Sequence, residues 1–440
     1  MSRLAIFGGK PVRKRLFPFY RTVGKEEKKA LCGVIDSGVL SEFLGSWDEK
    51  YFFGGPGVRR LEGEWAKYFG VKHAIAVNSC TSGLYCAAGA AGISLGDEVI
   101  VSPYTMSASA TAAVVFQGVP VFADIEEDYF CLDPVSVEER ITPRTRAIIV
   151  VDIFGQPYDA DRINAIARRH KLAVIEDAAQ APGARYRGKY AGTLADIGVF
   201  SLNCHKHIQC GEGGIVVTDN DELADRVRLI RNHAEAVVGD KKQKNLVNMV
   251  GYNFRMTELE AAVSICQLKK LKGLLGARQD NCRYLESKLG AVPAIVIPPK
   301  RPHCEHAYYI QPFKFNKEAA GVGRDLFLDA VRAELAPTEK SEDLGVRIWG
   351  GYVRPLYMQP MYQKRIAYGR SGLPFSRKFY KGKADYSKGT CPVAERMYGS
   401  ELFINDLMHA GMKKNDLDDV VSAFEKVWEN RSELKRRSGA

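Results

Sequence analysis

The sequence lacks the features that mark membrane proteins, disulfide-rich secreted proteins and zinc-binding modules. No apolar run in its 440 residues approaches the roughly 20 that a membrane-spanning helix needs. The opening segment is too polar and broken for a signal peptide. Ten cysteines are scattered from Cys32 to Cys391 without a Cys-x-x-Cys pair, which argues against a zinc ribbon or a disulfide framework. We therefore expect a reduced protein of the cytoplasm, with no membrane partner and no metal site.

The chain also has no internal repeat and no long low-complexity segment. Hydrophobic residues make up 46% of it and charged residues 26%, which together indicate a globular chain with a sizeable core. Lysine and arginine number 63 and aspartate and glutamate 52, which gives a net charge of +11. We expect basic runs such as 241–244 and 435–437 to be solvated surface, although such charge can also attract an anionic substrate. A nucleic-acid partner is not expected, because the chain has no recognition helix, paired aromatic motif or zinc finger.

Strand-like and helix-like segments alternate along the first part of the chain. Short apolar runs predict strands at residues 73–77, 98–102, 119–123, 147–151, 172–176, 197–201 and 214–218. Helical spacing predicts helices at 58–70, 84–91 and 159–170, and another that begins near Ser107. This alternation predicts an α/β fold whose mostly parallel sheet is covered by helices on both faces. In such sheets, ligands bind beyond the carboxyl ends of the strands.

The pattern changes after a long amphipathic helix that is expected at 258–275. Short β-like pieces follow at 294–297 and 307–310, with helices at about 325–335 and 416–430. Residues 340–390 are rich in Tyr, Pro, Gly and Arg and have little periodicity. The sequence therefore predicts a large α/β domain over 1–274, and a smaller α+β domain over 275–440 that carries an irregular insertion at about 340–390.

Small polar residues follow the first predicted strand, in the segment Asn78-Ser-Cys-Thr-Ser-Gly83. A loop of this kind that opens a helix presents free backbone N–H groups and hydroxyls, which suit a phosphate. An ordinary helix N-cap is the alternative interpretation.

An acidic residue, Asp177, ends another predicted strand, in the segment Ile175-Glu-Asp-Ala-Ala-Gln180. A buried carboxylate at such a place is costly unless it meets a cation or hydrogen-bond donors, and a protonated pyridine nitrogen would be such a partner. Taken alone, this residue is better explained as another helix cap.

A lysine, Lys206, lies in a polar loop between two predicted strands and is followed by the glycine-rich turn that ends at Gly214. Held near an electron-poor ring, a lysine amine can form a Schiff base. A surface lysine is the alternative. The flanking His205 and His207 are weak evidence for a metal, because no carboxylate or thiol is in register with them.

These motifs resemble, in order and over nearly the full length, the fold-type-I, PLP-dependent sugar aminotransferases of the DegT/StrS group. The most specific pair is Glu176–Gln180 together with the Phe200–Gly214 run. Four other segments carry the resemblance: 4–13, 53–60, 251–258 and 391–396. It implies a large domain with a mostly parallel sheet of seven strands, a smaller C-terminal domain, and pyridoxal 5′-phosphate (PLP) as the cofactor.

The resemblance also implies catalytic roles. Lys206 would hold the cofactor as an internal aldimine and move the proton in both half-reactions of a ping-pong transamination. Asp177 would pair with the pyridinium nitrogen. Gln180 would lie near the cofactor's phenolic oxygen.

Further cofactor contacts follow from the same comparison. Thr81, Ser82 and Ser201 would bind the phosphate. Asn253 would reach the phosphate in the neighbouring subunit, so a homodimer is expected. Where the family usually has an aromatic residue against the ring, this chain has Met106, whose sulfur can also pack on a ring.

The acceptors of the family are mostly nucleotide-linked keto-sugars or keto-cyclitols, and its amino donor is usually glutamate or glutamine. The segment 350–362 is similar to the branch that acts on inosose and in aminoglycoside pathways. Candidate substrate contacts are Tyr104, His306, Tyr308, Arg354 and Tyr357.

Two other activities fit a chain of this type. Some relatives are deoxysugar dehydrases that carry histidine at the position of Lys206, and the lysine here favours transamination over dehydration. A PLP-binding regulator without catalysis is the other alternative, against which the complete set of Asp177, Gln180, Ser201 and Lys206 argues.

Overall fold

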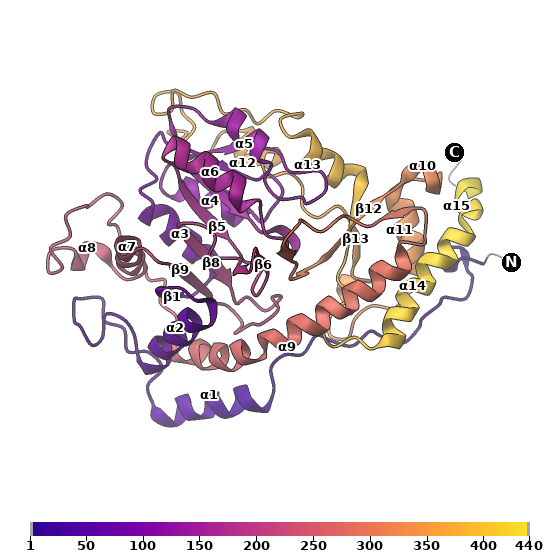
Figure 1. Cartoon of the computed structure of the whole chain (residues 1–440), viewed down its shortest axis with the longest axis horizontal. Helices are drawn as coiled ribbons and strands as arrows, with labels where there is room; N and C mark the ends of the chain where they lie inside the picture. Colours follow the sequence, from indigo (N-terminus) through magenta and orange to yellow (C-terminus); the bar gives the residue numbers. More distant parts are fainter. Residues whose placement is uncertain (1–2, 438–440) are drawn as a thin grey trace.

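The computed structural model describes residues 3–437, and its centre is a sheet of seven strands (Figure 1). The strand order is β1-β9-β8-β5-β4-β2-β3. All neighbours pair in parallel except β9, which is antiparallel to both β1 and β8. The strands are β1 (His73–Val77), β2 (Glu98–Val101), β3 (Val119–Phe122), β4 (Thr145–Val151), β5 (Ala173–Asp177), β8 (Ile197–Ser201) and β9 (Gly214–Thr218). The predicted α/β fold with a mostly parallel sheet is confirmed.

Helices cover both faces of this sheet, as its unbroken apolar strands require. Alternate residues of β1 belong to different cores: Ile75 and Val77 pack into one cluster, Ala74 and Ala76 into the other. The side chains of a strand point to opposite faces in turn, so the two clusters are the two faces of the sheet. We call the seven-stranded sheet and the helices around it the large unit. Its helices are α2 (Pro56–Phe69), α3 (Cys80–Ala90), α4 (Ser107–Val115), α5 (Pro134–Arg140), α6 (Ala160–His170) and α7 (Asp221–Arg231).

A second, antiparallel sheet lies at the other end of the molecule, beside the two termini (Figure 1). Its order is β10 (Ile295–Val296), β12 (Gln311–Phe315), β14 (Leu402–Asn405), β13 (Ile348–Gly350). The helices α11 (Arg324–Ala333) and α14 (Lys414–Glu429) share a hydrophobic core with this second sheet. We call the second sheet and these helices the small unit. A long helix, α9 (Glu258–Leu289), runs from the large sheet to this unit.

Short elements complete the chain. β11 (Cys304–Glu305), β6 (Arg185–Tyr186) and β7 (Lys189–Tyr190) form a small antiparallel sheet. The remaining helices are α1 (Lys25–Ser37), α8 (Ala234–Val237), α10 (Lys317–Ala320), α12 (Pro360–Gln363), α13 (Pro392–Arg396) and α15 (Arg431–Arg437), with single turns at Ala5–Phe7, Ile153–Gly155, Glu342–Leu344, Leu356–Met358 and Met397–Glu401.

The division of the chain at residue 274 stays a prediction, and the packing adds two facts to it. The N-terminal segment packs against the small unit: Leu4 and Phe17 belong to its core. Arg13 forms ion pairs at 2.9 Å with Asp416 and at 2.7 Å with Asp419. The second fact is that α9 continues without a break across the proposed boundary.

The irregular insertion packs against the large unit. Aromatic rings of Tyr362 and Tyr386 meet Phe122 of β3 edge-on. The hydroxyl of Tyr380 donates a hydrogen bond of 2.6 Å to the buried Glu98 of β2. The insertion therefore covers the β3 edge of the large sheet.

Two local expectations are corrected. Residues 307–310 are not a strand: Tyr308 has a φ of +51°, and β12 begins only at Gln311. Arg278 of α9 instead donates hydrogen bonds to the carbonyls of Tyr308 and Tyr309, at 3.0 and 2.7 Å. The long helix extends to Leu289 rather than to 275.

Within residues 3–437, no helix combines the length and the apolarity that would let it cross a membrane.

Candidate active site

The predicted site residues meet in a pocket at the carboxyl ends of the parallel strands, where such sheets bind ligands. Val151, Asp177 and Ser201, the last residues of β4, β5 and β8, line it. The pocket has a volume of about 340 Å³. Six of the residues expected from the sequence line its wall: Thr81, Met106, Asp177, Gln180, Ser201 and Lys206.

The N-terminus of α3 forms one side of the pocket. Ser79 caps this helix, because its side-chain oxygen accepts the backbone N–H of Ser82 at 3.0 Å. Ser79, Cys80 and Thr81 all face the pocket. The first backbone N–H groups of a helix have no hydrogen-bond partner within the helix itself. The interpretation as a capped helix start is confirmed. The phosphate site stays a prediction, which the position of this helix start at the pocket allows. Ser82 itself is buried, and its hydroxyl donates to Asn78 Oδ1 at 2.7 Å.

Asp177 lies at the bottom of the pocket, buried and held by two donors. The hydroxyl of Ser109 donates to its Oδ2 at 2.7 Å, and the backbone N–H of Ala179 to its Oδ1 at 3.1 Å. Burial raises the pKa of Asp177, whereas these two donors and the nearby Lys206 act in the opposite direction. The carboxylate is thus oriented, and a cationic partner in the pocket would stabilise it.

Lys206 lies in a turn between β8 and β9 rather than in a strand. Its backbone N–H donates to the carbonyl of Asn203 at 2.9 Å. Its Nζ lies 4.2 Å from the centre of the Tyr309 ring, a cation–π distance. His205 faces the pocket, and His207 is buried, with Nε2 donating to the Ala307 carbonyl at 2.9 Å. Across residues 3–437, no three His, Cys, Asp or Glu side chains gather in a way that could hold a metal ion.

Gln180 is fixed at both ends of its amide. Its Oε1 accepts the backbone N–H of Phe154 at 2.6 Å. Its Nε2 donates to the hydroxyl of Tyr352 at 2.9 Å, and Tyr352 also lines the pocket. An amide nitrogen has two hydrogens, so Gln180 keeps a second donor for a ligand.

Two aromatic residues of the pocket, Tyr309 and Tyr352, were missed by sequence reasoning. Burial raises the pKa of each to about 12, so both hydroxyls stay protonated. Tyr309 comes from the segment before β12, which the sequence wrongly predicted as a strand, and Tyr352 comes from the loop after β13. Their richness in tyrosine was the available signal, but it does not say which ring reaches the pocket.

Met106 is on the pocket wall but 63% exposed, so it packs loosely at the mouth. Tyr104 is fully buried behind the wall, with its ring edge-on to that of Tyr352 at 6.1 Å. Tyr104 therefore supports Tyr352 and does not itself line the pocket. Asn253 is exposed outside the pocket of its own chain, and its Oδ1 accepts Arg255 Nε at 2.7 Å.

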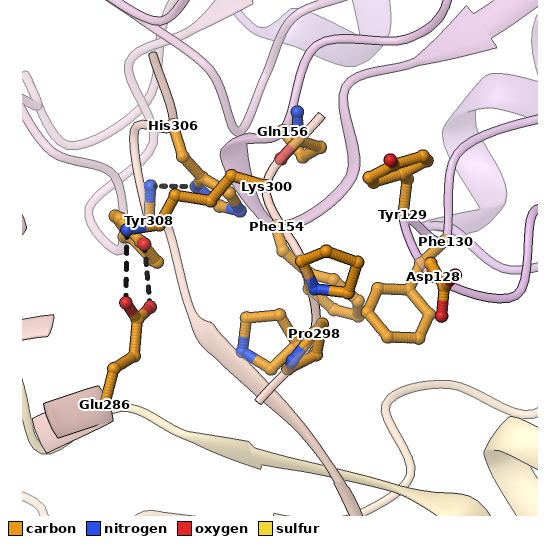
Figure 2. Close-up of a pocket in the computed structure, with 12 residues that line it drawn as sticks. Asp128, Tyr129, Phe130, Phe154, Gln156, Glu286, Pro298, Lys300, His306 and Tyr308 are labelled. Carbon is orange, nitrogen blue, oxygen red and sulfur yellow. Dashed lines mark hydrogen bonds and ion pairs between the residues drawn. The ribbon is translucent and has the colours of Figure 1, made fainter. Parts of the chain in front are cut away.

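His306 and Tyr308 face a different cavity, between the two units (Figure 2). Their rings stack at 4.0 Å, and His306 Nδ1 accepts the backbone N–H of Tyr308 at 2.8 Å. Burial lowers the pKa of His306 to about 3. The cavity, with Lys300 and Glu286 on its wall, has a volume of about 20 Å³, which is room for about one water molecule. The structure thus gives His306 and Tyr308 no place against a substrate.

The remaining substrate candidates belong to the insertion. Tyr357 is buried, and its hydroxyl donates to Glu395 and accepts the backbone N–H of Cys391. Its place is structural, and the expectation of a substrate contact is not supported. Arg354 is exposed and is not on the pocket wall, so its role stays a prediction.

The donor set fits PLP. A buried carboxylate, a primary amine, an oriented amide and a helix N-terminus with hydroxyls surround one pocket of about 340 Å³. These are Asp177, Lys206, Gln180 and the Ser79–Thr81 turn. Each matches one part of the cofactor: ring nitrogen, aldehyde, phenolic oxygen and phosphate.

Comparison with solved structures supports the class that this site indicates. The crystal structure of DesV from S. venezuelae is similar with a TM-score of 0.73, at 30% identity, covering 92% of this chain and 94% of that one. Fold and pocket together define a fold-type-I, PLP-dependent aminotransferase, and the predicted fold, cofactor and enzyme class are confirmed.

Sequence comparison identifies the family. The chain belongs to the DegT/DnrJ/EryC1/StrS aminotransferase family, whose profile matches residues 35–383. It is 32% identical to L-glutamine:2-deoxy-scyllo-inosose aminotransferase of Micromonospora echinospora, over 99% of this chain and all of the relative. It is 34% identical to GDP-perosamine synthase of Caulobacter vibrioides, over 83% of this chain and 89% of the relative.

Proposed function

We propose that this enzyme transfers an amino group from glutamate or glutamine to a keto-sugar carried on a nucleotide, or to a keto-cyclitol. The observation that carries this proposal is one pocket shared by Lys206 and Asp177, with the N-terminus of α3 beside it. Bound PLP supplies an electron sink at which the amino group is taken from the donor and passed to the acceptor.

The chain's own residues supply orientation and proton transfer. Lys206 is the base in the pocket, and its amine holds the proton that leaves one carbon and returns to another. Asp177, fixed by Ser109, keeps a protonated ring nitrogen paired. Thr81 and Ser201 offer hydroxyls, and the start of α3 offers backbone N–H groups, to the phosphate.

The assignment of a homodimer belongs to this proposal. Asn253 is exposed, and three exposed apolar residues precede it: Leu246, Val247 and Val250. Apolar side chains this exposed commonly mark a contact surface. In a dimer, Asn253 would contribute to the pocket of the neighbouring subunit.

Covalent trapping tests the cofactor assignment directly. Borohydride added to the PLP-loaded protein is expected to fix the cofactor on the peptide that contains Lys206. The Lys206→Ala variant should carry no trapped cofactor. Trapping on another lysine would contradict the proposal.

Turnover tests the donor and the acceptor separately. Glutamate or glutamine should convert the visible spectrum of the bound cofactor to that of its amine form. Nucleotide keto-sugars and keto-cyclitols offered next should restore the first spectrum, with product mass as the readout. A spectrum that no amino donor changes would favour a binding protein without catalysis, and loss of water from a sugar without amination would favour a dehydrase.

A further inference from the structure

The residue that follows Lys206 is buried and bonded to a distant segment of the chain. His207 is 1% exposed, and its ring N–H, on Nε2, donates to the carbonyl of Ala307 at 2.9 Å. Burial lowers the pKa of His207 well below its ordinary value, so the ring is neutral and carries a single N–H. Within residues 3–437, the other ring nitrogen, Nδ1, has no hydrogen-bond partner. The hydrogen bond to Ala307 therefore anchors this ring.

The segment that accepts this hydrogen bond is itself firmly held. The backbone N–H of Ala307 donates to the carbonyl of Gly155 at 2.8 Å. The backbone N–H of Tyr309 donates to the carbonyl of Phe154 at 2.7 Å. Arg278 of α9 also donates to the carbonyl of Tyr309, at 2.7 Å. The segment therefore gives the histidine ring a fixed point of attachment.

The same segment carries the aromatic ring that Lys206 contacts. Tyr308, with a φ of +51°, faces the small cavity of Figure 2, whereas the next residue, Tyr309, faces the Lys206 pocket. The amine of Lys206 lies 4.2 Å from the centre of the Tyr309 ring. The lysine and this tyrosine are thus connected twice: directly, at the amine, and through the hydrogen bond between His207 and Ala307.

The N-terminal segment holds the turn of Lys206 from another side. The hydroxyl of Tyr20 donates to the backbone carbonyl of His207 at 2.7 Å. The ring of Tyr20 lies 5.1 Å from the guanidinium of Arg278, within the range of a cation–π contact. Two distant parts of the chain, at Tyr20 and at Ala307, therefore bind the residue next to the lysine, one at its carbonyl and the other at its ring.

This anchoring matters because a lysine side chain is long and flexible. Its amine stays in one place only if the backbone that carries it is fixed, and a displacement of about 1 Å can remove much of the benefit of a reactive group. His207 itself is not on the wall of the Lys206 pocket. Its influence on a ligand there must therefore pass through Lys206.

We propose that His207 is a positioning residue for Lys206: its ring N–H, bonded to Ala307, holds the turn of the lysine against the segment that carries Tyr309. This inference rests on the proposed function, because Lys206 is the amine that would bond to the aldehyde of PLP. It predicts that bonding to the aldehyde depends on His207, whereas binding of the rest of the cofactor does not.

Two forms of the cofactor separate these contributions. PLP has the aldehyde, whereas pyridoxamine 5′-phosphate has an amine in its place and cannot form a Schiff base with a lysine. In equilibrium dialysis with the cofactor-free, full-length protein, His207→Leu should weaken PLP binding about tenfold, the size expected when a hydrogen bond to a buried carbonyl is lost. Pyridoxamine 5′-phosphate should bind this variant within about twofold of the wild type. Equal weakening of both forms, or of neither, would overturn the proposal.

A conservative variant tests the hydrogen bond itself. Glutamine has a side-chain N–H that can replace the Nε2–H of histidine. His207→Gln should therefore bring the affinity for PLP back to within about threefold of the wild type. PLP binding that stays as weak as in His207→Leu would contradict a role for this hydrogen bond.

A milder variant keeps the test valid if His207→Leu does not fold. Tyr20→Phe removes only the hydroxyl that donates to the His207 carbonyl, and it should weaken PLP binding about threefold without changing the affinity for pyridoxamine 5′-phosphate. No change in either affinity would count against the anchoring of this turn.

A destabilised control separates positioning from a general loss of stability. Val427→Ala removes buried methyl groups from the core of the small unit, so it should lower the stability and leave both affinities unchanged. A selective loss of PLP binding in this control would show that reduced stability alone produces the effect. A wild-type enzyme that binds PLP and aminates no keto-sugar or keto-cyclitol would contradict the proposed function and leave the role of His207 standing. Turnover by the wild type together with unchanged PLP binding in His207→Leu would overturn the role of His207 alone.

Discussion

At the scale of single residues, Tyr352 links the small unit to the catalytic pocket. Tyr352 follows Gly351, which has a φ of +69°. A Cβ added to Gly351 would lie 2.7 Å from the carbonyl oxygen of Tyr398. A residue other than glycine would be strained there. The ring of Tyr352 lies 5.2 Å from that of Phe154, edge-on, and its hydroxyl accepts from Gln180.

The Tyr352→Phe variant should therefore release one end of the Gln180 amide. We expect kcat to fall about threefold to tenfold, the effect of one lost hydrogen bond. We also expect the pH at which the visible band of the bound cofactor changes to shift, which a merely structural defect would not cause. Tyr368→Phe, at an exposed position of the same insertion, is the control. An unchanged pH profile would show that Tyr352 does not position Gln180.

A second residue-scale prediction concerns two buried carboxyl groups beside Asp177. Burial raises the pKa of Asp152 and of Glu176, and the two are neighbours. The Glu176 oxygens accept the backbone N–H groups of Gly192 and Leu194, at 2.6 and 2.8 Å, so Glu176 is the ionised member. We infer that Asp152, whose pKa is raised by burial and by the nearby Glu176, holds the proton.

This arrangement makes stability depend on pH with a definite sign. Between the ordinary carboxyl pKa of about 4 and the raised value, the folded state binds more protons than the unfolded state, so the free energy of unfolding falls as pH rises. Asp152→Asn keeps a donor but cannot titrate. Urea unfolding at about pH 5 and about pH 8 should show a smaller difference for this variant than for the wild type. Asp240→Asn, at an exposed position, should leave the difference in unfolding free energy between the two pH values unchanged. An unchanged difference for Asp152→Asn would contradict the proton on Asp152.

At the scale of elements, α3 owes its position to a glycine. A Cβ on Gly83 would lie 2.7 Å from Val199 Cγ1 and 3.1 Å from Val216 Cγ2, so the helix lies unusually close to β8 and β9. That closeness puts the N-terminus of α3 at the pocket. The small residues of this helix were visible in the sequence, but the approach to the sheet depends on what lies opposite them.

Gly83→Ala should push α3 outward. We expect a loss of about 1–3 kcal/mol in the free energy of unfolding, the usual cost of overpacking. PLP should also bind more weakly, measured by equilibrium dialysis. Gly63→Ala is the matched control, because an added Cβ in α2 meets nothing within 4 Å. That change should stabilise the protein by up to about 1 kcal/mol through helix propensity. A stable Gly83→Ala protein with normal affinity for PLP would disprove the role of close packing.

At the scale of the whole molecule, the basic runs of the surface differ in how far they are exposed to solvent. The basic run at 241–244 is not wholly solvated, because Lys241 pairs with Asp225 and lies 4.5 Å from the Trp47 ring. Lys435 and Arg436 of the C-terminal run are exposed. Most of the excess positive charge lies instead on the insertion.

The exposed apolar residues before Asn253 predict that two copies of the chain form a dimer through this segment. Replacing Leu246 and Val250 with lysine should convert the proposed dimer to a monomer, because two charges cannot be buried there unpaired. Size-exclusion chromatography with light scattering measures this directly. Ile35→Lys, at an equally exposed site on α1, should leave the dimer intact. A wild-type monomer at all concentrations would disprove the role of Asn253 in a neighbouring pocket.

The sequence alone predicted the mostly parallel sheet, because buried parallel strands are apolar along their length. It also placed polar residues after neighbouring strands, whose carboxyl ends meet at one edge of a sheet. The family resemblance of these motifs then pointed to six of the residues that line the pocket. Only the tertiary structure placed Tyr309 and Tyr352 in the pocket and His306 and Tyr308 outside it. These contacts join segments that are distant in the chain, so tertiary packing and not the local sequence decides them.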